Sequence, residues 1–412
     1  MTTETVQASR RLPQGELIAM LAFLFATVAF SMDAMLPALP EIAAQLTPDD
    51  VNRAQLILTS FMAGMGLGTL FAGPVSDAIG RKPAMAIGFA IYLAASAVAL
   101  FVNSLELLLA ARFAQGLGAA APRIVGTALV RDLYSGREMA RITSFIMMVF
   151  MIVPALAPLI GMGFITLMGW HGVFIGFILF GGIGWLWLSL RQPETLPPPA
   201  RRPLQVGTLW AGVREVLSDR QVLLSTVTIS LGFGQMFALL SSAQQLFGET
   251  YGKGAQFPLW FAAMAILAGT GTLINSRLVM RVGMRRIARG AYAVQIWASA
   301  LFLLLLVTDV LPAGLHFAVF FLWAVGLFMM AGLTFGNLNA LAMQRMGHIA
   351  GLTASVVAAI STLGAVMIAA PVGLAYDGSA IPVATAAVVC SILAWTIIGW
   401  MRDPVPQART HH

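Results

Sequence analysis

Twelve long apolar runs dominate this sequence, and they restrict its fold more than any other feature. A helix needs about 20 residues to cross the hydrocarbon core of a bilayer, and the runs approach or exceed that length. A backbone in lipid must satisfy its own hydrogen bonds, and the runs do not alternate apolar with polar residues, so each predicts a helix rather than a barrel strand. The runs are residues 16–39, 51–75, 83–102, 105–130, 140–167, 172–190, 221–247, 258–280, 287–308, 314–342, 349–376 and 381–401.

The composition excludes an ordinary soluble protein. Hydrophobic residues make up 59% of the 412 positions and charged residues only 10%, whereas about 25% of the residues in soluble domains are charged. Most of the surface is therefore expected to face membrane lipid. The net charge of +7 does not indicate a nucleic-acid partner, because the 24 lysines and arginines form no dense basic face.

Several kinds of chemistry lack the residues that they need. The single cysteine, Cys390, excludes disulfide frameworks and cysteine-based zinc sites. The histidines are scattered and suggest neither a metal site nor a catalytic Ser/His/Asp arrangement. The sequence contains no phosphate-binding loop of the ATP-driven type, so we expect neither an enzyme nor a cofactor.

One polar stretch, residues 191–220, divides the runs into two sets of six. It contains five prolines and five arginines, which predicts an extended and partly stiff linker. A weak internal repeat supports the division, because a turn with glycine and basic residues follows the second run at 73–82 and the eighth run at 276–286. We therefore expect an all-α polytopic membrane protein with six-helix bundles at 1–190 and 221–412 around a central cavity.

The basic residues predict the orientation of the chain, since lysine and arginine collect in cytoplasmic loops. If both termini are cytoplasmic, all but four of the 24 basic residues fall on the cytoplasmic side. The exceptions are Arg53 and Lys253 on the opposite side, and Arg112 and Arg123 within a span. The opposite orientation would place this whole set of charges on the wrong face.

Asp33 is the acidic residue that lies within an apolar run, and Pro37 and Pro40 interrupt the run just after it. Ionisable residues inside a span are costly and commonly mark a substrate or proton pathway. Desolvation at this depth disfavours the charged carboxylate, so the group can gain and lose a proton. We expect Asp33 to couple protons and to contact substrate. The alternative is a helix-end carboxylate that reaches water beside Pro37.

Polar and small residues form a stripe along the fourth run. Arg112 and Arg123 are about three helical turns apart and point in nearly the same direction, with Gln115 between them. Such a stripe is expected to face the bundle interior or a wet cavity. We expect Arg112 to tune a nearby carboxylate, with an ion pair to Glu106 as the alternative. Gln115 and Arg123 are candidate substrate contacts, and a structural bond at Arg123 is equally compatible with the sequence.

Two segments are candidates for conformational gating. The turn at 73–82 combines glycines that permit a tight backbone, an acid that can pair with an arginine, and basic residues suited to the cytoplasmic leaflet. The candidate gating residues of this turn are Gly73, Asp77, Gly80, Arg81 and Lys82. In the fifth run, Pro154, Pro158 and Gly161 predict a kink and a close helix approach.

The runs of the second half carry fewer charges. Their polar candidates are Gln235, Gln244, Gln245, Asn337, Asn339 and Gln344. Amides within a span commonly form hydrogen bonds between helices, which is the alternative to substrate contact at each position. We take Gln235, Asn337 and Asn339 as candidate substrate-binding residues.

Four motifs resemble the major facilitator superfamily, in its twelve-helix drug:proton antiporter branch. The turn at 73–82 resembles the superfamily signature between helices two and three. Residues 109–118 resemble the fourth-helix signature, whose arginine matches Arg112 and is associated with proton coupling. Residues 154–163 resemble the fifth-helix antiporter signature in a loosened form, with Ala157 before Pro158. Residues 32–40 resemble the first-helix motif of the Bcr/CflA group of bacterial exporters, and related antiporters use the acid matching Asp33 as a proton and substrate site.

This resemblance implies the major facilitator fold, a bacterial inner membrane and no cofactor. We expect a monomeric drug:proton antiporter that exports small apolar or amphipathic compounds by alternating access, with the small molecule, protons and membrane lipid as its partners. A dedicated exporter or importer of an amino acid, sugar or siderophore is the alternative within transport. A receptor or an enzyme would need a soluble domain or a catalytic cluster, and the sequence shows neither.

Overall fold

The computed structural model describes residues 12–150, 152–201, 203–204, 206–344 and 346–401. Within these ranges the chain is helical almost throughout and forms no strand, as the apolar runs predict. Six of the arginines behind the predicted orientation lie outside the described residues: Arg10, Arg11, Arg202, Arg345, Arg402 and Arg409.

The first half of the chain begins with a long helix that ends at Asp33. Pro37, four residues later, has no N–H to donate to the carbonyl of Asp33, so the α-helix cannot continue there. Two 3-10 turns, η1 (Leu36–Ala38) and η2 (Val51–Gln55), lie around the next short helix. The helices of this half are α2 (Gln14–Asp33), α3 (Leu39–Leu46), α4 (Leu56–Ile79), α5 (Arg81–Ala99), α6 (Leu105–Leu133), α7 (Gly136–Phe150), α8 (Val153–Met168) and α9 (His171–Arg191).

The second half has the same general construction. Its first long helix begins at Arg220, because the side chain of Asp219 accepts hydrogen bonds from the backbone N–H groups of Gln221 and Val222. A π-helical turn at Leu246–Thr250 extends this helix. The helices are α10 (Val206–Ser218), α11 (Arg220–Gln245), α12 (Phe257–Val282), α13 (Met284–Thr308), α14 (His316–Met343), α15 (Ala350–Leu374) and α16 (Ile381–Trp400).

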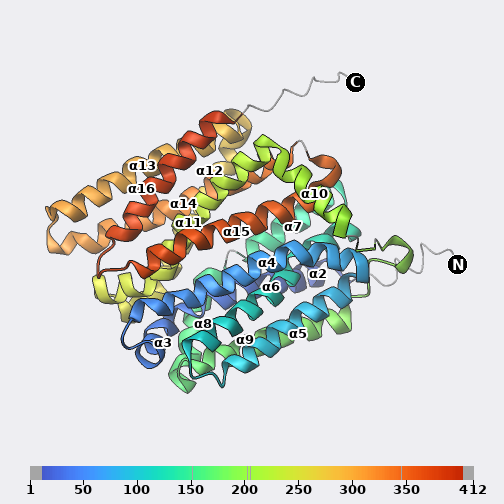
Figure 1. The fold of residues 1–412 in the computed structure, drawn as a ribbon, viewed down its shortest axis with the longest axis horizontal. Helices are drawn as coiled ribbons and strands as arrows, with labels where there is room; N and C mark the ends of the chain where they lie inside the picture. The colour runs from blue at the N-terminus through green and yellow to red at the C-terminus, as the bar shows by residue number, and fades with distance from the viewer. Residues whose placement is uncertain (1–11, 151, 202, 205, 345, 402–412) are drawn as a thin grey trace.

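In the described part of the chain, eleven helical segments are long and apolar enough to cross a membrane. The remaining long helix, α6, carries Arg112, Gln115 and Arg123 and is less apolar. It packs mainly against α4 and α5 and lies inside the first half of the molecule (Figure 1). The protein is therefore an all-α, multi-pass membrane protein.

One segment differs from the sequence-based expectation, and another is described only on both sides of a gap. The fifth run, predicted as one kinked helix over 140–167, contains α7, which ends at Phe150, and α8, which begins at Val153, while Met151 between them lies outside the described residues. Pro154 lies in the first turn of α8, where its missing N–H is tolerated. The linker is not extended throughout, because it contains α10. This helix packs on α15, and Glu215 lies 2.8 Å from the ring nitrogen Nε2 of His348.

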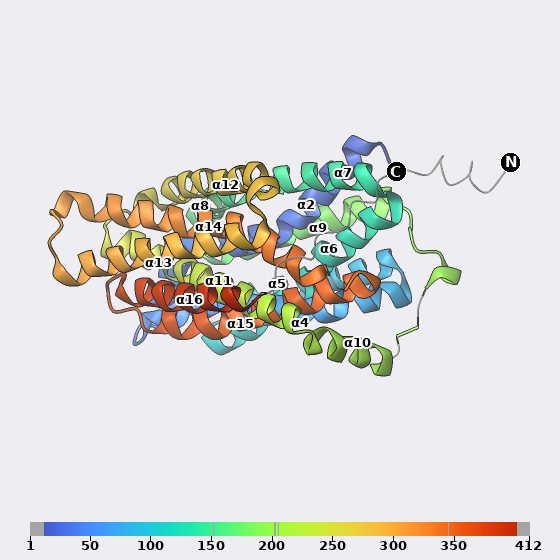
Figure 2. The same cartoon turned by 90° about the horizontal axis from the view of Figure 1, so that it is seen from above.

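Helices α2–α9 gather on one side of the molecule and α11–α16 on the other (Figure 1). Between the two groups, α4 packs along α15 and α8 packs along α12. Small residues permit this approach: a Cβ atom at Gly66 would lie only 3.1 Å from the side chain of Leu363. The long helices of both groups run in broadly the same direction in the second view (Figure 2).

The molecule has two distinct ends. We call the end that carries Arg81, Arg131 and Arg285 the basic end, and α10 lies at this end (Figure 2). We call the opposite end the far end, where α3 and η2 meet the end of α11.

Candidate functional site

Asp33 lies inside the protein, with 6% of its surface exposed. Its carboxylate forms neither a hydrogen bond nor an ion pair with any residue that the structure describes. Pro37 is also buried, so the alternative in which Asp33 reaches water beside this proline does not hold in this structure. A buried carboxylate without a partner is expensive when charged, which makes Asp33 the most unusual ionisable group of the interior.

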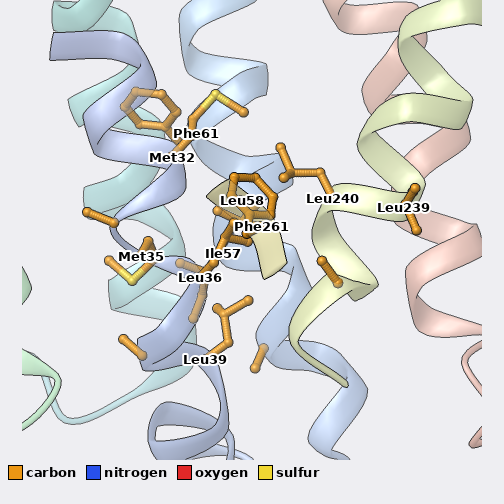
Figure 3. Packing of buried hydrophobic residues seen from close by; sticks show 14 of the residues in the cluster. Met32, Met35, Leu36, Leu39, Ile57, Leu58, Phe61, Leu239, Leu240 and Phe261 are labelled. Carbon is orange, nitrogen blue, oxygen red and sulfur yellow. The ribbon is translucent and has the colours of Figure 1, made fainter. Parts of the chain in front are cut away.

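The neighbours of Asp33 in the chain pack in an apolar cluster to which both halves contribute (Figure 3). The first half supplies Met32, Met35, Leu36, Leu39, Ile57, Leu58 and Phe61, and the second half supplies Leu239, Leu240 and Phe261. The two halves are therefore closed over the segment that carries Asp33.

Arg112 is completely buried on α6, and neutral oxygen atoms hold its guanidinium group. Its Nη2 donates a hydrogen bond of 2.9 Å to the backbone carbonyl of Ser31, and its Nη1 donates to the side-chain oxygen of Gln115. The guanidinium carbon also lies 4.5 Å from the centre of the Phe61 ring. Because Ser31 belongs to the last turn of α2, the arginine stabilises the partial negative charge at that helix end, two residues before Asp33.

Two further polar residues, Tyr92 and Ser96, extend this arrangement. Ser31 Oγ and the hydroxyl of Tyr92 share a hydrogen bond of 2.6 Å, and Gln115 Nε2 donates to Ser96 Oγ over 2.7 Å. Tyr92 and Ser96 are four residues apart on α5 and face the same way. The sequence analysis missed them, although their spacing within an apolar run was a usable signal.

The predicted alternative partner of Arg112 is wrong. Glu106 pairs instead with Arg53, with 3.0 Å between the charged atoms, at an exposed position. Arg112 forms no ion pair with Asp33 in this structure either, because its bonds go to Ser31 and Gln115. The tuning of Asp33 by Arg112 therefore stays a prediction about another conformation.

Arg123 differs from the rest of the stripe, because its side chain is exposed while Arg112, Gln115 and the residues between them are mostly buried. On α6, Gly116 faces α4 and Gly126 faces Phe25 of α2. Arg123 lies between these two directions and so points into the space between α2 and α4. None of the described residues forms a hydrogen bond or an ion pair with its guanidinium.

At the basic end, Arg81 connects three helices. Its side chain is only 4% exposed and pairs with Asp77 at the end of α4 over 2.5 Å, and with Asp132 near the end of α6 over 2.8 Å. Gly80, between α4 and α5, has a φ of 107°, which favours glycine. The predicted pairing of Asp77 with an arginine of a neighbouring helix is therefore present, and that arginine is the first residue of α5.

The linker contributes an acidic residue that the sequence analysis missed. Both carboxylate oxygens of Glu194 accept hydrogen bonds from the first turn of α5, at 2.9 Å from the backbone N of Arg81 and 3.0 Å from that of Lys82. A negative charge at a helix N-terminus is favourable. The Nζ of Lys82 donates to the carbonyl of Ser189 over 3.0 Å. The turn at 73–82 is thus joined to the start of the linker.

Two of the remaining gating candidates bring helices close together. Gly161 of α8 lies directly against the carbonyl of Ala34, so that a Cβ atom at this position would overlap it. Gly73 of α4 faces α15, where Ser355 Oγ would lie 3.6 Å from an added Cβ. Pro158 is buried inside α8. The close approach predicted for Gly161 is present, and it is directed at the segment that follows Asp33.

The amide candidates of the second half bond to neighbouring groups. Gln235 accepts a hydrogen bond of 3.1 Å from Ser391, and Asn337 donates one of 2.7 Å to Asn275, so each joins two helices. Asn339 donates to the carbonyl of Phe335 within its own helix over 2.9 Å. These contacts match the structural alternative at the first two positions, while substrate contact stays a prediction at all three.

The comparisons with known proteins agree with the motifs. Residues 21–370 match the Major Facilitator Superfamily. A bicyclomycin resistance protein homolog of Haemophilus influenzae is 31% identical, over 89% of this chain and 92% of its own length. The multidrug transporter MdfA of Yersinia pestis is 28% identical, over 70% of this chain and 71% of its own. A chloramphenicol resistance protein of Pseudomonas aeruginosa is 30% identical, over 66% of each chain.

The fold is also found among solved structures. A D-xylose–proton symporter superposes with a TM-score of 0.72 at 12% identity, over 92% of this chain and 97% of its own. A likeness at this identity concerns the fold alone. The family match covers most of the chain, and the first of the relatives named above is similar over nearly its whole length. The chain therefore belongs to the major facilitator superfamily, a superfamily of membrane transporters.

Proposed function

We propose that this protein exports small apolar or amphipathic drug-like compounds in exchange for protons. Relatives named for bicyclomycin resistance, chloramphenicol resistance and multidrug transport support a drug substrate over a sugar, an amino acid or a siderophore. The observation that carries the proton exchange is the buried carboxylate of Asp33, which has no partner among the described residues and lies at the junction of the two halves. No resident cofactor enters the proposed mechanism.

The basic end faces the cytoplasm in this proposal, and the far end faces the outside of a bacterial inner membrane. The concentration of lysine and arginine in the loops of the basic end supports this orientation. The protein acts as a monomer surrounded by lipid. Its moving units are residues 1–190 and 221–412, which the linker at 191–220 connects.

The burial of Asp33 explains why the protein exchanges a substrate for a proton. When the two halves close, as in this structure, a charged and unpartnered carboxylate is strongly disfavoured, while a protonated one is tolerated. A bound substrate that donates a hydrogen bond or carries positive charge can take the place of the proton. Closure around Asp33 therefore requires either a proton or a substrate. A proton taken up from outside displaces the substrate outward, and its loss to the cytoplasm restores the carboxylate.

The other site residues have proposed roles around this group. Arg112 stays on Ser31 in the closed state and stabilises the carboxylate when the halves separate, while Gln115 orients the arginine. Arg123 offers a free guanidinium to an anionic or acceptor group of a substrate from the cytoplasm. Gln235, Asn337 and Asn339 contact substrate only when their present hydrogen bonds open.

In this proposal the gating residues form the contacts between helices that must change when the two halves move. Arg81, with Asp77 and Lys82, joins α4, α5 and the end of α9 at the cytoplasmic end, and Glu194 of the linker accepts hydrogen bonds from the start of α5. Gly73 and Gly80 allow the close and turned backbone there. Pro154, Pro158 and Gly161 let α8 pack against the segment after Asp33, so that a shift of α8 changes the surroundings of the acid.

Flux measurements in liposomes test this function. Purified protein is reconstituted, a pH gradient is imposed, and the flux of radiolabelled chloramphenicol is followed for the native chain and for Asp33→Asn. We expect the gradient to drive flux in the native protein, and the flux of Asp33→Asn to fall to that of protein-free liposomes.

Asp309→Asn is the matched control. Asp309 is exposed and has a φ of 47°, a conformation that asparagine also adopts readily, so this change removes a carboxylate without disturbing the fold. It is expected to retain native flux. Gradient-driven flux that persists in Asp33→Asn would contradict the proposed coupling.

A further inference from the structure

A separate pocket opens at the far end, and Asp33 is not among its lining residues. Its cavity has a volume of about 110 Å³, or about 470 Å³ when the open solvent at its mouth is included. Leu39, Ala43 and Ala44 line it from the first half, and Gln244 and Gln245 line it from α11. The pocket is therefore built by both halves, at the end that faces outward in the proposed function.

Hydrogen bonds between neutral side chains close the molecule beside this pocket. Gln55 donates to the side-chain oxygen of Gln245 and accepts from Ser242 over 2.9 Å. Gln245 donates to Asn52 over 3.0 Å, and Asn52 donates to the carbonyl of Tyr376 over 2.7 Å. We call Asn52, Gln55, Ser242 and Gln245 the amide clasp. It joins η2 of the first half to α11 of the second half without any charged group.

The clasp and the pocket share residues. Gln55 and Gln245 belong to the clasp, and both also line the pocket. A molecule in the pocket therefore touches the side chains that hold the far end closed. Neutral hydrogen bonds of this kind contribute only about 1 kcal/mol each, so an occupant that competes for them can release the clasp.

Gln244 provides an unused hydrogen-bonding group in the pocket wall. Its side chain is 8% exposed, and its Oε1 is buried without a hydrogen bond to any described residue. A buried amide without partners is unfavourable. Rotation of the terminal amide is easy because its last torsion is broad, so either its oxygen or its nitrogen can be presented to an occupant.

The remaining lining residues define what the pocket accepts. Leu39, Ala43 and Ala54 provide apolar wall. Glu249, an exposed residue, is the one ionisable residue of the lining and disfavours an anion. The chemistry fits a molecule with an apolar body, no negative charge and at least one group able to form a hydrogen bond.

We propose that this pocket is an exit subsite, in which Gln244 recognises a hydrogen-bonding group of a neutral apolar substrate and the occupant loosens the amide clasp. The inference rests on the proposed export function and its orientation. It adds a second binding position, on the outer side of Asp33, and a preference among substrates. Compounds that form no hydrogen bonds pass this position without using Gln244.

Protection of an introduced cysteine tests the subsite. Ala44 is exposed and lines the pocket, so Ala44→Cys in a Cys390→Ser background places a single thiol there. Right-side-out vesicles are treated with a membrane-impermeant maleimide, and the alkylation rate is measured against increasing chloramphenicol or tetraphenylphosphonium. Chloramphenicol is neutral and carries N–H and O–H groups, whereas tetraphenylphosphonium forms no hydrogen bonds.

We expect chloramphenicol to slow alkylation, and Gln244→Leu to raise its half-protecting concentration about fivefold, as expected for one hydrogen bond. Any effect of tetraphenylphosphonium should be the same with and without Gln244→Leu. Gln256→Leu, at the same end but outside the pocket lining, should leave both compounds unaffected.

Three results would overturn the subsite. The first is an alkylation rate that chloramphenicol does not lower. The second is a half-protecting concentration of chloramphenicol that is the same with and without Gln244→Leu. The third is a loss of protection in Gln244→Leu that is equal for chloramphenicol and tetraphenylphosphonium. Gradient-driven chloramphenicol flux, measured on the same variants, remains native in each of these cases if the proposed function is right. A thiol that reacts only from the cytoplasmic side would instead contradict the proposed orientation.

Discussion

The two halves of the molecule differ in the polar groups that they bury. In the described residues, every buried charged side chain belongs to the first half: Asp33, Arg81 and Arg112. The buried polar groups of the second half are neutral amides and hydroxyls, such as those of Gln235 and Asn337. From this difference we infer that the first half binds and releases the proton, while the second half lines the transport path with neutral polar side chains.

The two related turns show how such a difference can arise on one backbone plan. Gly80 and Gly283 both precede a helix with positive φ values, of 107° and 89°. Arg81, directly after Gly80, pairs with two acids, whereas Met284 stands directly after Gly283. The next residues, Lys82 and Arg285, both donate to backbone carbonyls: Lys82 to Ser189 over 3.0 Å, and Arg285 to Ile398 and Gly399 over 3.1 and 2.9 Å. The repeat therefore kept the glycine and the second basic residue, while the buried arginine of the first turn is a methionine in the second.

Arg112→Met is expected to have the largest effect, because it removes the cation of the first half that is completely buried. Ser31 and Gln115 lose a charge-assisted partner, which should lower the free energy of unfolding by about 2–4 kcal/mol and abolish transport. Thermal unfolding in detergent and liposome flux measure the two effects. Native stability and native flux together would show that the charged interior of the first half is dispensable.

Gly161→Ala should come next, since its Cβ would overlap the carbonyl of Ala34. We expect a loss of about 1–3 kcal/mol in unfolding free energy and slower transport. Gly163→Ala is the matched control, because nothing lies within 4 Å of its Cβ position and both changes gain the same helix propensity. Similar unfolding temperatures for both variants would show that the contact next to Asp33 is loose.

Arg81→Gln compares the two turns directly. It removes the ion pairs with Asp77 and Asp132 and should cost about 1–2 kcal/mol, less at high salt because one partner is partly exposed. Arg286→Gln, an exposed position in the corresponding turn of the second half, should be close to neutral. Thermal unfolding at low and high salt measures both. An equal effect of the two changes would remove the distinction between the turns.

Gln235→Leu should have the smallest effect, although the residue is fully buried. Its Nε2 already lacks a hydrogen-bond partner among the described residues, so a leucine of similar volume removes one unsatisfied group along with one bond to Ser391. We expect a change in unfolding free energy within about 1 kcal/mol and retained transport. Complete loss of proton-driven flux in a well-folded variant would place a coupling role in the second half.

Much of the fold could be predicted from the sequence because apolar length is a strong and local signal. The runs predicted the long helices, and the resemblance predicted the superfamily. The sequence did not reveal α10, since its helical periodicity is short and follows closely after a proline-rich stretch.

The site was predictable where one residue stood out chemically. Asp33 and Arg112 were identifiable as ionisable groups within apolar runs. Their partners were not, because the bonds of Arg112 to Ser31 and Gln115 depend on how three helices pack. The amide clasp joins Asn52 to Gln245 across nearly two hundred positions of sequence, and only the packed structure brings such ordinary polar residues together.

Proton release on substrate binding tests the central claim most directly. Purified protein in a weakly buffered detergent solution is titrated with chloramphenicol while the pH is recorded. If substrate and proton compete for Asp33, the native protein should release up to about one proton per bound substrate, and Asp33→Asn should bind without release. Undiminished proton release from Asp33→Asn would contradict the account, because another group would then carry the exchanged proton.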